Sequence, residues 1–132
     1  MTETRSVVVE REFPHPPEKL WRALTQPHFI EEWLMKNDFK PEVGQRFDLS
    51  ADWGSVACQV KTLETARTLS YSWNTKDLDS VVTWTLTPTQ AGTLLRMEQT
   101  GFLQDQRSYY QGAVVGWQRF FSNLEEVVGK MD

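Results

Sequence analysis

The sequence of 132 residues is poor in side chains that bind metals or cross-link chains, with one cysteine and two histidines. The lone Cys58 excludes a disulfide within the chain and a cysteine-based metal cluster. No apolar run is long enough to cross a membrane, and the N-terminus carries charged residues where a secretory signal has an apolar core. We therefore expect a cytoplasmic protein without a membrane span.

Signatures of nucleotide and nucleic-acid binding are also missing. The sequence has no phosphate-binding glycine loop, no dinucleotide-binding glycine pattern and no nucleophile elbow. The formal net charge is -4, from 14 basic and 18 acidic side chains without a block of like charge. A nucleic-acid surface would instead have clustered lysines and arginines. We expect no cofactor and no nucleic-acid partner.

The few side chains that could carry out chemistry are poorly placed for it. His15 lies in a proline-rich turn and His28 near the start of a predicted helix, so neither has a second metal ligand at a suitable spacing. Cys58 alternates with valines, and a buried thiol in apolar surroundings keeps its proton. Arg96 and Glu98 should point away from the core, although either would become a candidate acid or ligand anchor inside a cavity. We expect no metal site and no catalytic residue.

The clearest pattern in the sequence is a helical one over residues 105–131. Because a helix turns once every ~3.6 residues, apolar residues three or four positions apart share one face. Either Asp105 or Ser108 could cap the first turn. The stretch is predicted to be one long amphipathic helix, with apolar residues at Tyr110, Val114, Trp117, Phe121, Leu124 and Val128.

The rest of the chain predicts an antiparallel sheet. Residues 6–13 alternate as a strand, and two short helices follow over residues 18–24 and up to about Leu34. From residue 47 to residue 97 apolar and polar residues alternate in five runs separated by short turns, which favour antiparallel neighbours. We expect one α+β domain over residues 1–132, in which a curved sheet of about six strands holds the long C-terminal helix across its concave face.

Several segments resemble one known family. Residues 21–33 read Trp-Arg-Ala-Leu-Thr-x-Pro-x-x-Ile-x-x-Trp, and residues 69–73, 80–84 and 116–117 add further matches in the same order. Together they resemble the activator-of-heat-shock-protein-90-ATPase-like (AHSA-type) group of the START-like (SRPBCC) superfamily, which includes birch-pollen-allergen-type lipid binders and polyketide cyclases. The resemblance implies a helix-grip fold, and most single-domain relatives are bacterial.

A curled sheet rarely touches a helix along its whole length, so we expect a cavity between them, at the end where the two short helices form a lid. The chain has more inward-facing aromatic rings than a small core needs, and their polar tips could orient a ligand. The predicted cavity-lining residues are Trp33, Tyr71, Trp73, Met97, Gln99, Tyr110, Val114 and Trp117.

Three functions are compatible with these patterns. The leading hypothesis is a protein that binds a small, largely apolar molecule, because the aromatic surplus comes without a catalytic constellation. The family resemblance adds a chaperone-related interaction domain, with contacts to a chaperone or to a second copy of the chain. The superfamily adds an enzyme of the cyclase or hydrolase type, which would use a cavity residue as acid or base. The sequence favours binding over catalysis.

The placement of the two histidines generates a first prediction. Replacing both His15 and His28 with alanine should leave ligand binding unchanged, since neither has a partner at catalytic or metal-ligand spacing. Elemental analysis of the purified protein should find no stoichiometric zinc before or after the change. Zinc that is present in the parent and lost from the double variant would contradict this interpretation.

Overall fold

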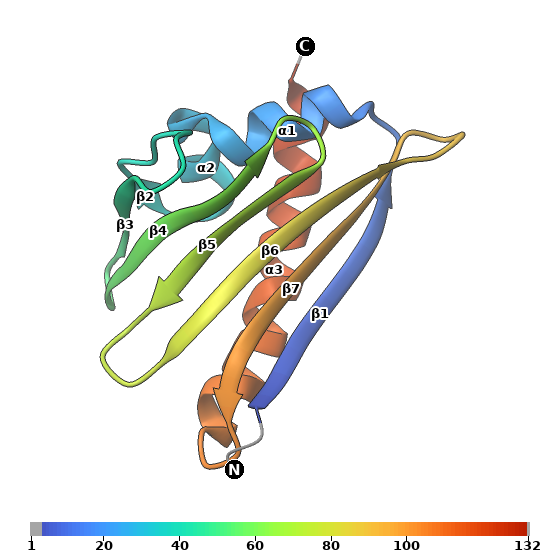
Figure 1. Ribbon diagram of the computed structural model, residues 1–132. Helices are drawn as coiled ribbons and strands as arrows, with labels where there is room; N and C mark the ends of the chain where they lie inside the picture. Colours follow the sequence, from blue (N-terminus) through green and yellow to red (C-terminus); the bar gives the residue numbers. More distant parts are fainter. Residues whose placement is uncertain (1–3, 132) are drawn as a thin grey trace.

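The computed structural model describes residues 4–131, which form three helices and a seven-stranded sheet (Figure 1). The elements follow the predicted order of strand, two short helices, further strands and a long helix. Their bounds are β1 Thr4–Phe13, α1 Pro17–Thr25, α2 Pro27–Trp33, β2 Lys36–Asn37, β3 Arg46–Ala51, β4 Gly54–Glu64, β5 Thr68–Asn74, β6 Asp79–Pro88, β7 Thr93–Leu103 and α3 Arg107–Lys130.

The sheet is antiparallel throughout, with the strand order β1-β7-β6-β5-β4-β3-β2. The predicted count of six strands is wrong by one. The additional strand is β2, whose residues Lys36 and Asn37 pair with Ser50 and Leu49 of β3. A two-residue strand cannot show an alternating pattern, because alternation needs at least four residues to be recognised. The predicted fold class and the arrangement of the other elements are confirmed.

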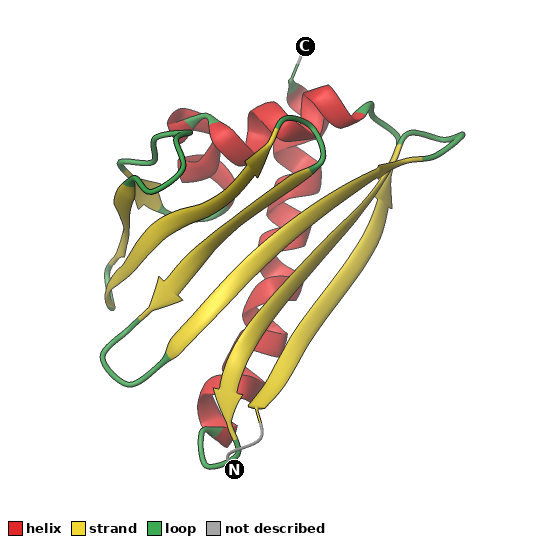
Figure 2. Ribbon diagram, viewed as in Figure 1, coloured by secondary structure: helices red, strands yellow, loops and turns green. Residues whose placement is uncertain are grey.

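The sheet curls around α3, which crosses its concave face, as predicted (Figures 1 and 2). On most strands alternate residues are buried against this face; on β6 they are Ser80, Val82, Trp84 and Leu86. Arg96 and Glu98 lie on the opposite phase of β7 and form an ion pair with each other. Their outward orientation is the one expected from the sequence, so neither side chain is placed to act as an acid or a ligand anchor between the helix and the sheet.

The start of α3 differs from the prediction. Neither Asp105 nor Ser108 caps the helix: the N-cap residue is Gln106, which makes no capping hydrogen bond from its side chain. The Gln106 amide is used elsewhere, since its oxygen accepts from the backbone N–H of Leu103 and its nitrogen donates to the carbonyl oxygen of Asp77. Ser108 lies inside the first helical turn, where its hydroxyl is past the capping position.

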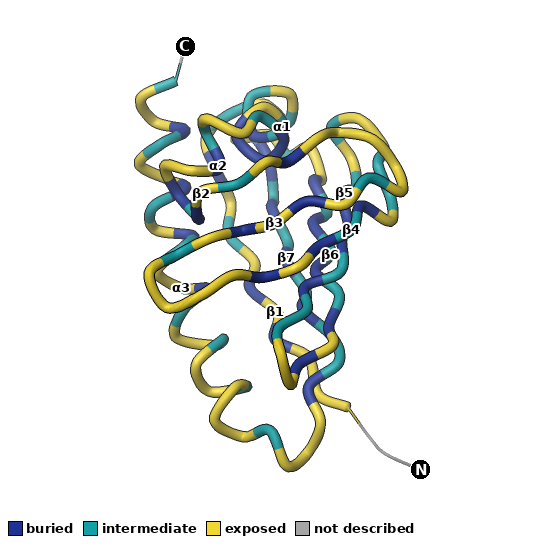
Figure 3. The backbone as a smooth tube through the Cα atoms, turned by 90° about the vertical axis from the view of Figure 1, so that its left-hand side faces the viewer, coloured by how far each residue is buried: buried dark blue, intermediate teal, exposed yellow. Residues whose placement is uncertain are grey.

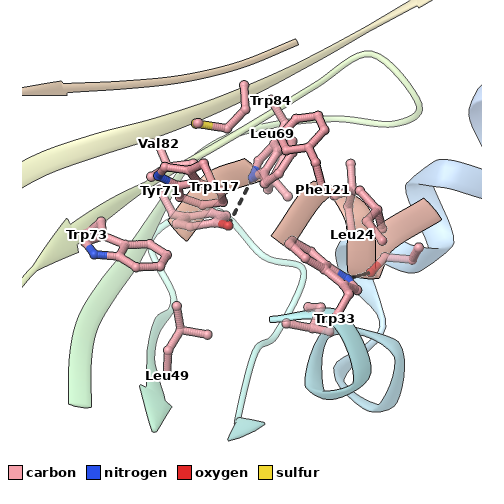
Figure 4. Packing of buried hydrophobic residues seen from close by; sticks show 14 of the residues in the cluster. Leu24, Trp33, Leu49, Leu69, Tyr71, Trp73, Val82, Trp84, Trp117 and Phe121 are labelled. Carbon is pink, nitrogen blue, oxygen red and sulfur yellow. Dashed lines mark hydrogen bonds between the residues drawn. The ribbon is translucent and has the colours of Figure 1, made fainter. Parts of the chain in front are cut away.

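A cluster of aromatic rings joins the helices to the sheet, with Trp84 of β6 at its centre (Figure 4). The Trp84 ring stacks on Phe121 of α3 at 5.6 Å and meets Trp33 of α2 edge-on at 5.6 Å. Its indole N–H donates to the Tyr71 hydroxyl over 3.0 Å, so the one polar atom of the ring is satisfied. The cluster therefore fixes α2 and α3 on the same region of the sheet.

This packing generates a stability prediction. Phe121→Ala removes a fully buried ring that stacks on Trp84, so it should lower the free energy of unfolding by ~3–5 kcal/mol in a denaturant titration. Arg119→Ala, an exposed position of the same helix, should change it by less than ~0.5 kcal/mol. A loss below about 1 kcal/mol for Phe121→Ala would mean that the buried face of α3 has been assigned wrongly.

Candidate functional site

The contact between α3 and the sheet is uneven along the helix. The buried residues of α3 are Trp117, Phe121, Leu124 and Val128, which run from the middle of the helix to its C-terminal end. The preceding turns, residues 107–116, are mostly exposed (Figure 3). Their residues Gly112, Ala113 and Gly116 line a space between the helix and the sheet. A Cβ atom added to either glycine would have no heavy atom within 4 Å outside its own helix. These small residues leave space where larger side chains would pack.

A pocket of about 670 Å³ occupies that space, and we call it the α3 pocket. Its walls come from the N-terminal half of α3, the hairpin that joins β5 to β6, the turn that joins β3 to β4, and the facing part of β7. Most of the large side chains around it are aromatic: Trp53, Trp73, Phe102, Tyr109, Trp117 and Phe120. Because Trp53 and Tyr109 are largely exposed, the pocket opens to solvent.

A chain of hydrogen bonds holds the inner wall of the α3 pocket. The Trp117 indole N–H donates to Oε1 of Gln99 over 2.7 Å, and Nε2 of Gln99 donates to Oγ of Ser80 over 3.0 Å. The Ser80 hydroxyl in turn donates to the Trp73 carbonyl oxygen over 2.7 Å. Four elements, α3, β7, β6 and β5, are thereby linked. The buried amide is held in one orientation, because a buried polar group is costly unless it is hydrogen-bonded.

The rim of the pocket is polar and ties the β5–β6 hairpin to the start of α3. The Tyr109 hydroxyl donates to Oδ2 of Asp77 over 3.2 Å, and the hydrogen bond and the negative charge of Asp77 both raise the pKa of Tyr109. Lys76, next in the hairpin, lines the rim and forms no ion pair within residues 4–131. Charge is thus confined to the mouth, while rings and one amide form the interior.

The structure brings together three of the eight residues predicted to line a cavity. Trp73, Gln99 and Trp117 line the α3 pocket, where the rings of Trp73 and Trp117 lie 5.3 Å apart. The other five, which lie outside the lining of the α3 pocket, are Trp33, Tyr71, Met97, Tyr110 and Val114.

Those five residues have other surroundings. The Trp33 indole donates to the Ala23 carbonyl oxygen over 2.8 Å, while Met97 is fully buried in the core. Burial raises the pKa of Tyr71, whose hydroxyl accepts from Trp84. The remaining two belong to α3: Tyr110 meets the Phe102 ring edge-on at 5.7 Å, and Val114 is 39% exposed.

The pocket also lies at the other end of α3 from the predicted one. The short helices pack against the C-terminal half of α3, where Phe29 and Glu32 of α2 face Asn123 and Val127 (Figure 1). A second, smaller pocket of about 460 Å³ lies at that end, between α2 and the last turns of α3, whereas the α3 pocket lies toward the N-terminus of α3. A sequence signal for this position exists: glycines at positions 112 and 116 interrupt the interior of a helix, where glycine costs about 1 kcal/mol relative to alanine.

The remaining reactive side chains lie away from the pocket. Burial raises the pKa of the Cys58 thiol to about 12, with smaller contributions from Asp48 and Asp38. Slight burial, with the charge of Lys19, lowers the pKa of His15. Within residues 4–131, no cluster of three or more His, Cys, Asp or Glu side chains could hold a metal ion. No helix in this part of the chain is long and apolar enough to cross a membrane.

Comparisons with known proteins agree with this fold. Residues 14–129 match the family described as Activator of Hsp90 ATPase homolog 1-like protein. The crystal structure of MLL2253 from Mesorhizobium loti is 61% identical with a TM-score of 0.94, over 97% of this chain and 99% of that one. BH1534 from Bacillus halodurans is 28% identical with a TM-score of 0.85, over 97% and 99% of the two chains.

A more distant structure shows the same fold. CalU16 from Micromonospora echinospora is 24% identical with a TM-score of 0.84, over 97% of this chain and 78% of that one. The comparison with curated proteins gave no match.

The surroundings of Cys58 generate a prediction about thiol reactivity. Because the reactive form is the thiolate and the folded pKa is about 12, an aromatic disulfide reagent at pH 8 should label Cys58 slowly in the native protein and rapidly in urea. The folded state favours the protonated thiol, so this group should lower stability as the pH rises above its ordinary pKa of 9.0. Rapid native labelling at pH 8 would show that the thiol is accessible.

Proposed function

The chain belongs to the Activator of Hsp90 ATPase homolog 1-like family, whose match covers most of its length, and from this premise we propose that it binds a small, largely apolar molecule in the α3 pocket. The observation that carries the proposal is the placement of Gly112 and Gly116 on the inward side of α3. Each glycine weakens the helix by about 1 kcal/mol relative to alanine, and neither is needed to avoid a clash. A binding site explains why the space between helix and sheet is kept open.

The chemistry of the pocket favours binding over catalysis. Its interior offers aromatic rings and the Gln99 amide, while the titratable side chains Lys76, Asp77 and Tyr109 lie at the mouth. A pocket with apolar walls and few polar groups is typical of small-molecule sites, in which the polar groups set the orientation of the ligand. General acid–base catalysis would instead need a titratable group within hydrogen-bond reach of the reacting atom.

Protein binding, including contact with a chaperone, is the second candidate. It would use the outer side of α3, where Val114 is 39% exposed and Val115 is 66% exposed. Two neighbouring valines provide less apolar surface than the patches of several hundred Å² that mark protein-binding sites. The α3 pocket is the larger unoccupied apolar feature, so we rank ligand binding first.

The proposal predicts that Gly116→Leu separates binding from stability. The new side chain should enter the pocket without a clash and should improve helix propensity by up to ~1 kcal/mol, so the melting temperature should stay the same or rise. The neutral dye N-phenylnaphthylamine, whose fluorescence increases in apolar surroundings, should bind the parent with roughly micromolar affinity. Its affinity for the variant should fall at least about tenfold, as measured by fluorescence titration.

Gly129→Leu is the matched control for this experiment. Gly129 is also in α3, an added Cβ there also meets nothing within 4 Å, and the residue lies outside the pocket. The control should bind the dye as the parent does. A stable Gly116→Leu protein that still binds the dye normally would show that the ligand site is elsewhere.

A further inference from the structure

The inner wall of the α3 pocket contains one buried amide, that of Gln99. This residue is on β7, opposite Val82 of β6 and Val7 of β1, and its side chain is only 2% exposed. An amide on an apolar sheet face is costly unless each of its atoms has a partner. In the part of the chain that the structure describes, every buried side-chain nitrogen and oxygen has at least one hydrogen-bond partner.

The partners of Gln99 fix which way its amide points. The Trp117 indole N–H can only donate, so the atom facing it at 2.7 Å must be the amide oxygen. The amide nitrogen therefore faces the other way and donates to Oγ of Ser80 over 3.0 Å. Ser80 accepts this bond because its own hydrogen goes to the Trp73 carbonyl oxygen. The orientation is thus determined by three neighbours within the protein.

The amide nitrogen carries two hydrogens, and Ser80 takes one. Within residues 4–131, Nε2 of Gln99 has no acceptor other than Ser80. A buried N–H without an acceptor costs about 1–3 kcal/mol, and an acceptor on a ligand would remove that cost. Since Gln99 lines the α3 pocket, a ligand in the pocket lies beside this amide.

We infer that Gln99 determines specificity in the α3 pocket by donating its second amide hydrogen to an oxygen acceptor on the inner end of a flat aromatic ligand, such as a ketone, quinone or phenol oxygen. This inference rests on the proposed function, because it names the chemical class that the same pocket binds.

The surrounding residues narrow the ligand class. The rings of Trp73 and Trp117 at the inner wall, with Phe120 beside Trp117 at 5.4 Å, provide flat surfaces that suit an aromatic ring. A carboxylate at this depth would lose its hydration, and the cation that lines the pocket, Lys76, is at the mouth. A neutral oxygen needs only the single donor that Gln99 provides.

Two probes of the same shape test the inference: acetylnaphthalene and ethylnaphthalene, which differ in a carbonyl in place of a methylene. Their affinities would be measured by displacement of N-phenylnaphthylamine from the parent protein and from Gln99→Met, which keeps the side-chain length and removes the amide. The preference for the ketone, expressed as the ratio of the two dissociation constants, should fall about tenfold in the variant, which corresponds to one hydrogen bond. The infrared carbonyl band of the bound ketone should shift to higher frequency in the variant.

A second comparison keeps the test decisive if Gln99→Met folds poorly, since that change leaves the Trp117 N–H without its acceptor. Trp117→Phe removes this N–H, so the single variant Trp117→Phe and the double variant with Gln99→Met differ only in the amide. Because Trp117 also lines the pocket, both variants should bind the two probes more weakly than the parent, so only the ratio of the two dissociation constants is compared. The preference for the ketone should be lower in the double variant than in the single one, and an equal ratio in the two would contradict the inference.

The outcomes separate the two proposals. If both probes bind and the ratio is unchanged by loss of the amide, Gln99 has a structural role only and this inference is overturned, while the pocket remains a binding site. If the dye binds the parent but neither probe displaces it, this inference is overturned and the pocket remains a binding site. If the dye does not bind the parent either, the proposed function itself is overturned.

Discussion

The packing of Trp84 against Phe121 and Trp117 is the contact on which the rest of the structure depends. It brings β6, the middle of α3 and, through Trp33, the second helix onto one region of the curved sheet. The three rings lie 5.6–5.7 Å from Trp84, and the polar atom of Trp84 is satisfied by Tyr71. The N-terminal part of α3 has lighter contacts with the sheet, such as that of Tyr110 with Phe102 of β7.

The pocket follows from that division of the helix. Beyond Trp117, toward the N-terminus, the inward residues are small, and the hairpin from β5 to β6 reaches α3 only at its first turns, through Asp77. Space is therefore bounded at both ends: by aromatic packing at Trp117 and by a polar tie at Tyr109. The Gln99 network belongs to the first boundary, which is why its amide is rigid although it faces an open volume.

Much of the fold could be predicted from the sequence, because it rests on strong periodic patterns. The apolar period of α3 and the alternation of β3 to β7 identify the inward faces, and for this reason Trp73, Gln99 and Trp117 could all be expected to face the space between helix and sheet. The strand β2 was missed because two residues have no period. The cap was missed because Gln106, a weak capping residue, replaces the expected serine or aspartate.

The position of the pocket could not be read from periodicity, since a period identifies the face of a helix but gives no information on how far along the helix the partner surface extends. Val114 shares the spacing of Trp117 and Phe121, yet it is 39% exposed and lies outside the lining of the α3 pocket. Gly112 and Gly116 carry the information on the position of the pocket, because they have no side chain to occupy the space beside the helix.

The two glycines also have a consequence for how this fold changes over generations. Almost any substitution at either position adds helix propensity and meets no steric barrier. Random mutation without selection would therefore tend to fill the pocket and make the protein more stable at the same time. On the proposed function, selection for ligand binding keeps this space open, and the volume of the pocket can change through single substitutions whose first side-chain atom meets no neighbour.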